Sequence, residues 1–208
     1  MLLDYLKTAF VTLLVTIDPP GLAPLFIGLT MGMEAAQKRE VALRAVLIAF
    51  GIMAAFGFAG DIVMKALGIS LPAFRIAGGL LLFWIAFEMI FELRARRKNT
   101  IAEEAITVDH VRNIAAFPLA IPLMAGPGAI TATILLAGRA GPDYAMLSGL
   151  MGVIALIMAI TYLCFLLSER ISSLLGTTGN IVLTRLLGVI LAALAVQFVI
   201  DGVLAIGK

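Results

Sequence analysis

The amino-acid sequence predicts an all-α membrane protein whose six transmembrane helices form two inverted-topology repeats of three helices each. Three observations lead to this fold class. The chain of 208 residues is 62% hydrophobic and 13% charged, with a mean hydropathy of +1.11, which leaves too little polar surface for a soluble domain. Apolar runs long enough to cross a bilayer recur six times. Six of the eight prolines fall within two of these runs, where they interrupt the helix that the composition otherwise favours.

The apolar runs account for most of the chain and divide it into two similar halves. We expect residues 1–97 to form the first three-helix repeat, residues 98–113 a cytoplasmic linker, and residues 114–208 the second repeat. Because almost nothing lies outside the runs, we expect the activity to take place within the bilayer, among the helices and the cavities between them. The expected transmembrane segments are 5–29, 41–66, 71–93, 114–137, 145–168 and 181–206.

The first apolar run contains an aspartate and three prolines, in the order Asp18-Pro19-Pro20-Gly21-Leu22-Ala23-Pro24. Aspartate is a preferred helix N-cap, and proline suits the first helical position because its missing N–H would be unpaired there. The ten residues from Thr8 to Ile17 make about 15 Å of helix, half of a ~30 Å hydrocarbon core. The sequence therefore predicts a helix broken at mid-membrane depth, with Asp18 near the midplane and a second half-helix beginning at Pro19.

The fourth apolar run is interrupted in the same way, at Gly126-Pro127-Gly128. Its first part, about twelve residues from Ile114 to Ala125, is expected to form about 18 Å of helix before the break. When Pro20-Gly21 is superposed on Pro127-Gly128, Asp18 falls opposite Ala125. This break is therefore also expected near the midplane, but without an acidic side chain.

The third span of each half also shares a motif, since Arg185-Leu186-Leu187-Gly188 matches Arg75-Ile76-Ala77-Gly78. The repeat is thus about 110 residues long and contains three spans. An odd number of spans makes the second copy enter the membrane from the opposite side, so that the two copies are inverted repeats.

Basic residues lie mainly at the connections on one side of the predicted bundle. By the positive-inside rule this side is cytoplasmic, so both termini are predicted to point out of the cytoplasm. The densest basic cluster runs from Arg94 to Lys98 and contains no aromatic residue. We interpret it as a topology anchor in contact with the lipid bilayer, and we expect no nucleic-acid partner.

Cysteine and histidine are too scarce for metal or redox chemistry. The chain has one cysteine, Cys164, and one histidine, His110, which excludes an intramolecular disulfide and a His/Cys metal cluster. A serine protease would need a Ser/His pair inside the membrane, and the sole histidine lies in the predicted linker. We therefore expect no cofactor, no metal and no enzymatic activity.

The two breaks together predict a solute-binding site. Helix N-termini that converge in one cavity present unpaired amides and positive dipole ends, which bind anionic groups. The amides of Gly126 to Ala129 are free to bind a carboxylate, while Asp18 offers a partner for an ammonium group. We therefore expect a zwitterionic amino acid, and the small residues around the breaks favour a small one. The predicted substrate-binding residues are Thr16, Asp18, Pro19, Gly21, Ala125, Gly126, Gly128, Ala129 and Thr131.

Four residues are candidates for ion coupling or for lining the path. A carboxylate in a low-dielectric cavity could take up a proton near neutral pH, so Asp18 permits proton coupling. Arg75 and Arg185 lie near span ends, where a path role and snorkelling toward the interface are equally open. Gln197 is a weaker candidate for the path. Asp18 could also be only an N-cap, but a midplane charge is costly, and we therefore favour a functional role.

Two other functions stay open at this point. An ion channel could use Asp18, Asp61 and Asp201 as a cation path, since broken helices in inverted repeats also occur in channels. An exporter of another small solute would share the same architecture. Saturable transport distinguishes a carrier from a channel.

Three motifs of the sequence are distinctive: Asp18-Pro19-x-Gly21-x-x-Pro24-x-Phe26, the stretch from Phe117-Pro118 to Ile130-Thr131, and the ending Arg185-x-x-Gly188…Gln197…Gly202. Together they resemble the MarC/SnatA family of six-span membrane proteins, over nearly the whole chain and without a departure in the central motifs. The resemblance implies a multi-pass protein of the bacterial or archaeal plasma membrane. It also implies transport of small neutral amino acids such as glycine and alanine, coupled to protons. The oligomeric state is left open.

Overall fold

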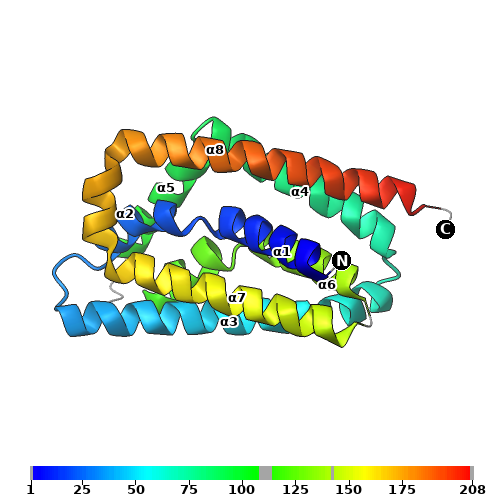
Figure 1. Cartoon of the computed structure of the whole chain (residues 1–208). Coiled ribbons are helices and arrows are strands. Elements are labelled where there is room, and N and C mark those ends of the chain that lie inside the picture. Colours follow the sequence, from blue (N-terminus) through cyan, green and yellow to red (C-terminus); the bar gives the residue numbers. More distant parts are fainter. Residues whose placement is uncertain (1, 108–113, 142, 207–208) are drawn as a thin grey trace.

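The structure, a computed structural model, describes residues 2–107, 114–141 and 143–206, with residues 61 and 102–107 described by their backbone alone. Helices and connecting turns make up this described part, without a strand among them (Figure 1). The helices are α1 (Leu2–Ile17), α2 (Pro19–Leu29), α3 (Ala35–Ala66), α4 (Leu71–Ile90), α5 (Leu93–Thr107), η1 (Ala115–Met124), α6 (Pro127–Ala140), α7 (Tyr144–Leu166) and α8 (Ser168–Leu204).

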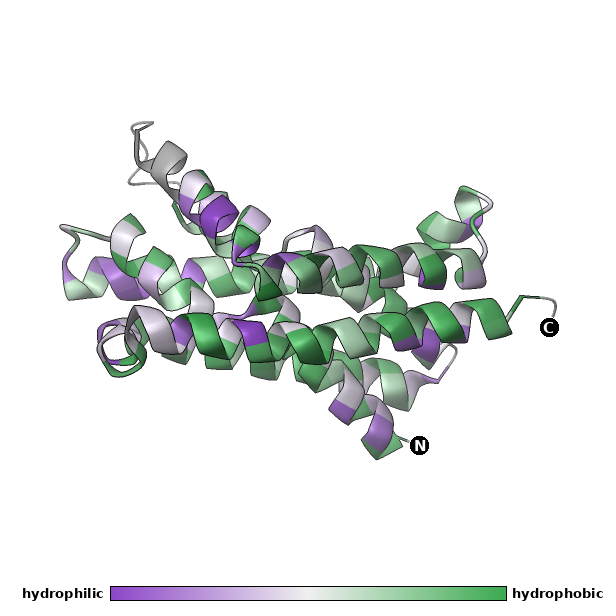
Figure 2. Cartoon of the chain, turned by 90° about the horizontal axis from the view of Figure 1, so that it is seen from above, coloured by the Kyte–Doolittle hydropathy of each residue, from purple (hydrophilic) through white to green (hydrophobic). Residues whose placement is uncertain are grey.

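Within the described residues, five helical segments are long and apolar enough to cross a membrane. The first joins α1 and α2 from Leu2 to Leu29, and the others lie in α3, α4, α7 and α8. The bent pair of η1 and α6 makes a sixth if the two are counted as one broken span. Figure 2 shows hydrophobic residues along the long helices. The predicted all-helical membrane fold is thus confirmed, with five or six spans.

Helices α4 and α8 run antiparallel and pack closely along their length (Figure 1). A Cβ atom added to Gly202 would lie 3.0 Å from the Pro72 carbonyl oxygen, and one added to Gly188 would lie 3.2 Å from the Ala86 carbonyl oxygen. Small residues let helix backbones approach one another, which is the usual basis of tight helix pairs in membranes.

We expect Gly79→Ala to weaken this helix pair. The new Cβ would lie 2.8 Å from the Ala195 carbonyl oxygen and 2.7 Å from a Val199 methyl carbon. Separating the backbones should lower the free energy of unfolding by about 1–3 kcal/mol, measured by thermal unfolding in detergent. Gly152→Ala on α7 is the matched control, because nothing lies within 4 Å of its Cβ position. Equal melting temperatures for the two variants would contradict the expectation.

Both predicted breaks are confirmed. Helix α1 ends at Ile17 and α2 begins at Pro19, with Asp18 as a left-handed N-cap (φ 59°, ψ 63°). The second break separates η1 from α6, whose axes are bent by 59°. Gly126 is the N-cap of α6, and Pro127 is its first residue.

The segment before the second break is not the regular helix that the sequence predicted over residues 114–125. Phe117 (φ −134°, ψ 125°) and Ile121 (φ −126°, ψ 125°) have extended backbones inside η1. Each precedes a proline, and a proline ring disfavours the α conformation in the residue before it. Pro118 and Pro122 also lack the N–H that a regular helix needs. The expectation of about 18 Å of helix was therefore wrong.

The segment predicted as a linker, residues 98–113, begins inside helix α5. This helix continues to Thr107, while residues 108–113, including His110, lie outside the described part. The start of α5 packs against the first break, so that Arg94 is 7% exposed and Lys98 is 6% exposed. Interpreting Arg94 to Lys98 as a topology anchor alone therefore missed a role for two of its residues inside the protein.

Candidate functional site

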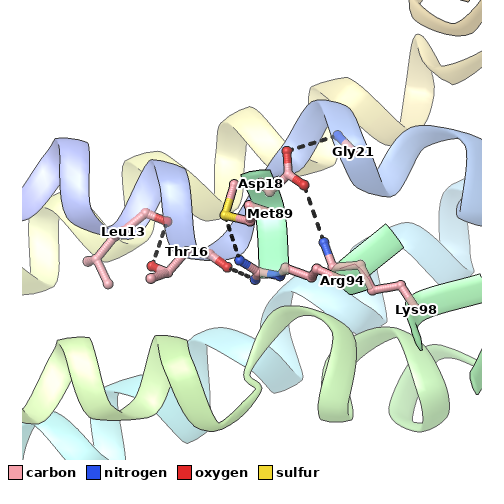
Figure 3. A network of polar contacts seen from close by, with 7 residues as sticks. All are labelled: Leu13, Thr16, Asp18, Gly21, Met89, Arg94 and Lys98. Atoms are coloured by element: carbon pink, nitrogen blue, oxygen red, sulfur yellow. Dashed lines mark hydrogen bonds and ion pairs between the residues drawn. The ribbon is translucent and has the colours of Figure 1, made fainter. Parts of the chain in front are cut away.

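The prolines that follow the first break leave carbonyl groups of α1 without helical donors. In a continuous helix the Val15 and Thr16 carbonyls would accept from the amides at positions 19 and 20, but both positions are proline. Arg94 supplies a donor instead: its Nη2 donates to the Thr16 carbonyl, and its Nη1 lies 3.1 Å from the Met89 sulfur (Figure 3). A cation at this position also complements the negative end of the α1 dipole.

The Asp18 carboxylate is buried and bound on two sides. Its Oδ1 accepts a hydrogen bond from the Gly21 amide at 3.2 Å, and its Oδ2 lies 3.4 Å from the Lys98 ammonium nitrogen (Figure 3). Glycine at position 21 makes room for this carboxylate, since a Cβ there would lie 2.1 Å from Oδ2. Asp18 is only 3% exposed. Water therefore screens the ion pair weakly, and each partner depends on the other for its counter-charge.

Arg94 and Lys98 lie on one face of α5 because they are four residues apart. Arg97, between them in sequence, ties α5 to α4 through an ion pair of 2.8 Å with Glu88. Helix α5 is not one of the candidate spans.

Burial lowers the pKa of Lys98 to about 8. The Asp18 carboxylate acts to raise this pKa, whereas Arg94 and Arg97 lower it further. Burial also lowers the pKa of Arg94. Lys98 is therefore a cation that can lose its proton at mildly alkaline pH.

A cavity of about 340 Å³ lies beside Asp18, between α2, α5 and α8. Helix α8 changes direction near its start (Figure 1). Gly176, whose φ of 57° suits glycine, lies at this kink, and residues on both sides of it line the cavity. The Oδ1 of Asn180 is buried without a hydrogen-bond partner among the described residues. This space, called the Asp18 cavity, is lined by Asp18, Gly21, Pro24, Leu25, Glu92, Arg94, Ala95, Arg96, Lys98, Asn99, Ser172, Gly176, Thr177, Asn180, Ile181 and Thr184.

A second cavity, of about 390 Å³, lies at the N-terminus of α6. Gly126 caps this helix without a side chain, so the amides of Gly128 and Ala129 receive no side-chain cap. Such amides at the positive end of a 14-residue helix favour a negatively charged group. This space, called the Gly126 cavity, is lined by Thr16, Leu81, Trp84, Ile85, Arg94, Arg97, Lys98, Ile101, Pro122, Leu123, Met124, Gly126, Pro127, Gly128 and Ala129.

The two cavities share a wall, because Arg94 and Lys98 line both. Each cavity is lined by three cations, but only the first also has carboxylates, Asp18 and Glu92. These carboxylates are the groups that could bind an ammonium group, whereas the second cavity suits a carboxylate. Both volumes fall in the range of about 300–1,000 Å³ that is usual for small-molecule sites. The described residues contain no group of three or more His, Cys, Asp or Glu side chains that could hold a metal.

Known proteins match this chain over nearly its whole length. The sequence profile described as "MarC family integral membrane protein" matches residues 3–206. The chain belongs to the MarC family. Its relatives include an archaeal "UPF0056 membrane protein" of Archaeoglobus fulgidus, 39% identical over 201 residues, which cover 96% of this chain and 92% of the relative.

Two bacterial members of the MarC family are nearly as similar. "UPF0056 membrane protein YvbG" of Bacillus subtilis is 35% identical over 200 residues, covering 96% of this chain and 94% of the relative. "UPF0056 inner membrane protein MarC" of Salmonella typhimurium is 34% identical over 206 residues, covering 95% of this chain and 93% of the relative. No solved structure matches the chain. The resemblance to the family that the motifs indicated is thus confirmed.

In this MarC-family chain the predicted substrate-binding residues divide between the two cavities. Asp18 and Gly21 line the Asp18 cavity, whereas the Gly126 cavity is lined by Thr16, Gly126, Gly128 and Ala129. We had expected both breaks to face one cavity. The side chains of Arg94 and Lys98 occupy the space between them, which the sequence did not indicate.

Three further predicted residues do not line either cavity. Pro19 and Ala125 are buried next to the N-caps of α2 and α6. Thr131 faces α4, because a Cβ added to Gly78 would lie 2.9 Å from its methyl carbon. The Thr16 hydroxyl donates to the Thr12 carbonyl at 2.6 Å. Pro19, Ala125 and Thr131 therefore support the breaks or the packing, and the Thr16 hydroxyl bonds within its own helix.

The residues predicted for coupling or the path lie outside the walls of both cavities, Asp18 excepted. Arg185 forms an ion pair with Glu92, and it reaches the Asp18 cavity only through that carboxylate. Gln197 donates to Asp201 at 2.7 Å, and Asp201 is also paired with Arg139.

Arg75 packs at the other end of α4, with its Cβ 3.1 Å from the Cβ position of Gly202. Its Nε is buried without a hydrogen-bond partner among the described residues. The side chain of Asp61, one of the three aspartates of the channel alternative, lies outside the described part.

The sequence-based prediction missed Arg94, Lys98 and the polar residues of α8. A signal for Arg94 was present in the sequence. Two consecutive prolines after α1 remove two backbone donors and leave carbonyl groups that need another partner. The prediction considered only the amides at the breaks. The contribution of Thr177, Asn180 and Thr184 depends on how α8 packs, and their sequence gives no local pattern for it.

Proposed function

We propose that the chain is a secondary transporter that carries small neutral amino acids across the plasma membrane by alternating access, with the proton as its coupling ion. One observation carries this proposal. The Asp18 carboxylate and the amide end of α6 flank a common wall, formed by Arg94 and Lys98, at the two breaks in the helices.

The chemistry of a zwitterion fits these groups. An ammonium group would bind Asp18 and could donate to the unpartnered Asn180 Oδ1, while a carboxylate would bind the Gly128 and Ala129 amides. The Arg94 guanidinium lines both cavities and would face the carboxylate. Both charges of a small amino acid thus have candidate partners.

The contacts of α4 and α8 support an inverted repeat as the basis of alternating access. Arg75 of α4 packs near Gly202 of α8, and the matching Arg185 of α8 pairs with Glu92, just after the end of α4. A shift of about 110 residues relates Arg75 to Arg185 and Glu92 to Gly202, so the two contacts are equivalent, as expected for two copies related by a two-fold axis. Rocking one copy against the other would expose the site to each side in turn.

We also propose a plasma-membrane location with both termini outside the cytoplasm. The Salmonella typhimurium relative is named as an inner membrane protein. The orientation rests on the positions of the basic residues. A reporter fused to either terminus, active on only one side of the membrane, tests it.

Uptake of labelled alanine into proteoliposomes tests the proposed function. We expect saturable uptake by the wild-type protein, stimulated by a pH gradient, and at least a tenfold loss in the double variant Asp18→Asn/Lys98→Met. This variant removes the carboxylate without leaving a buried lysine unpaired, and asparagine remains a good N-cap. Asp143→Asn, at the exposed N-cap of α7, is the matched control and should retain uptake.

Unsaturable flux with unitary currents would contradict a carrier and support the channel alternative. Two aspartates of the channel alternative, Asp18 and Asp201, are already paired with cations, which weighs against an open cation path. Saturable transport of a different small solute, with no uptake of alanine or glycine, would indicate the exporter alternative instead.

A further inference from the structure

The Lys98 ammonium occupies the position that the proposed function assigns to the amino group of the solute. Its nitrogen lies 3.4 Å from Asp18 Oδ2, and the side chains of both residues are more than nine-tenths buried (Figure 3). A primary ammonium on a flexible stem presents the same charge and the same donors as the amino group of an amino acid. Lys98 is therefore chemically equivalent to a bound solute at this carboxylate.

The Asp18 carboxylate and the free amides of α6 lie in different cavities. The Gly126 cavity has amides and cations but no carboxylate in its lining, and the Asp18 cavity has carboxylates and cations but not the α6 amides. Lys98 lines both. Withdrawing its side chain would remove part of the common wall and free the Asp18 carboxylate.

We propose that the two cavities are halves of a single amino-acid site, and that Lys98 closes this site by competing internally with the amino group of the solute for Asp18. This inference rests on the proposed function. It assigns to Lys98 a role in binding and gating that is separate from the topology of the chain.

An exchange of one ammonium for another keeps the buried carboxylate paired at every stage. A buried carboxylate without a partner is strongly unfavourable, so an empty site needs a cation at Asp18. Lys98 supplies that cation in the absence of solute. A solute with a carboxylate but no amino group cannot displace it, which would select amino acids over hydroxy acids such as lactate.

The groups around Lys98 allow its release. Asp18 at the first break holds its ammonium, whereas Arg94 and Arg97 of α5 repel it. The nearby carboxylates Glu88 and Glu92 are paired with Arg97 and Arg185. Asp18 is thus the counter-charge that holds Lys98 in the closed site.

Binding of alanine to purified protein in detergent tests the inference. We expect Lys98→Met to bind alanine about tenfold more tightly than the wild type. This factor corresponds to a wild-type site that Lys98 occupies about nine-tenths of the time, so that only about a tenth of the molecules are free to bind. Lys7→Met, at an exposed position of α1, is the control and should leave the affinity unchanged. Lactate should bind neither the wild type nor the control variant.

A second measurement does not require the fold to tolerate an uncharged residue at position 98. Raising the pH from 7 to 9 should strengthen alanine binding to the wild type by up to about tenfold, because Lys98 loses its proton near pH 8. Lys98→Arg keeps its charge throughout this range, so its affinity for alanine should not rise between pH 7 and 9.

The possible results distinguish this inference from the proposed function. Tighter binding by Lys98→Met together with a pH response that Lys98→Arg lacks would support the inference. If the wild type binds alanine but Lys98→Met binds no more tightly, the inference fails and the proposed function stands. If no amino acid binds the wild type at any pH, both fail.

Discussion

Replacement of Asp18 by asparagine is expected to lower the free energy of unfolding by about 3–5 kcal/mol, because the Lys98 ammonium is left buried without its counter-charge. Asparagine keeps a side-chain oxygen that can accept from the Gly21 amide, so the cap on α2 is retained and the change isolates the charge. Unfolding in mixed detergent micelles, followed by circular dichroism, measures the loss.

The loss has an upper limit that depends on pH. Lys98 can avoid burying its charge by losing its proton, which at pH 7 costs about 5 kcal/mol for an amine whose ordinary pKa is 10.5. Its pKa is lower in the folded protein than in the unfolded chain, so the folded state binds fewer protons and stability rises with pH. Without Asp18 this pKa falls further, so the variant begins to gain stability at a lower pH than the wild type, and its deficit should shrink as the pH rises from 7 to about 8.

A double-mutant cycle with Lys98→Met separates the ion pair from other effects. Each single variant should be destabilised, and the double variant should recover most of the loss because no buried charge remains unpaired. If the two single effects simply add in the double variant, the ion pair contributes nothing to the folded state. That result would also remove the basis for competition between Lys98 and the solute.

The parts of this structure that local chemistry determines were predicted from the sequence. The break at Asp18 follows from an N-cap followed by prolines, and the break at Gly126 follows from glycine and proline in an apolar run. The spans follow from hydropathy. The irregular η1 was also within reach, because the restriction on a residue before proline is local, but only the proline at the break itself was considered.

The parts of the site that depend on packing were not predicted. Arg94 and Lys98 were interpreted from the positive-inside rule, which treats a basic cluster as a whole and not residue by residue. Their positions four residues apart indicate a common face, but nothing local shows that this face turns toward Asp18. As a result, one cavity was expected where α5 makes two.

Replacement of Arg94 by methionine is expected to weaken alanine binding by about 10–150-fold, the range for losing a hydrogen bond to a charged group. Arg94 lines both cavities and, in the proposed site, its guanidinium faces the solute carboxylate. Methionine keeps an unbranched apolar stem of similar shape, so the packing against Met89 should be largely preserved. Calorimetric titration of the purified variants with alanine measures the change.

Arg94 also supports the fold, so a loss of affinity must be separated from a loss of stability. The methionine variant leaves the Thr16 carbonyl without its donor, which should lower the melting temperature as well. Arg94→Lys keeps the positive charge but not the planar fork that reaches two acceptors, and its affinity should fall between those of the wild type and the methionine variant. Arg39→Met, at an exposed position on α3, should change neither quantity.

The comparison of alanine with methylamine then decides how Arg94 acts. Methylamine has the ammonium group without the carboxylate, so an Arg94 that binds the carboxylate directly contributes nothing to methylamine affinity. Arg94→Met should therefore weaken alanine binding and leave methylamine binding unchanged. Equal weakening of both ligands would mean that Arg94 acts only by holding α1 and α5 together, and the carboxylate of the solute would then depend on the amides of Gly128 and Ala129 alone.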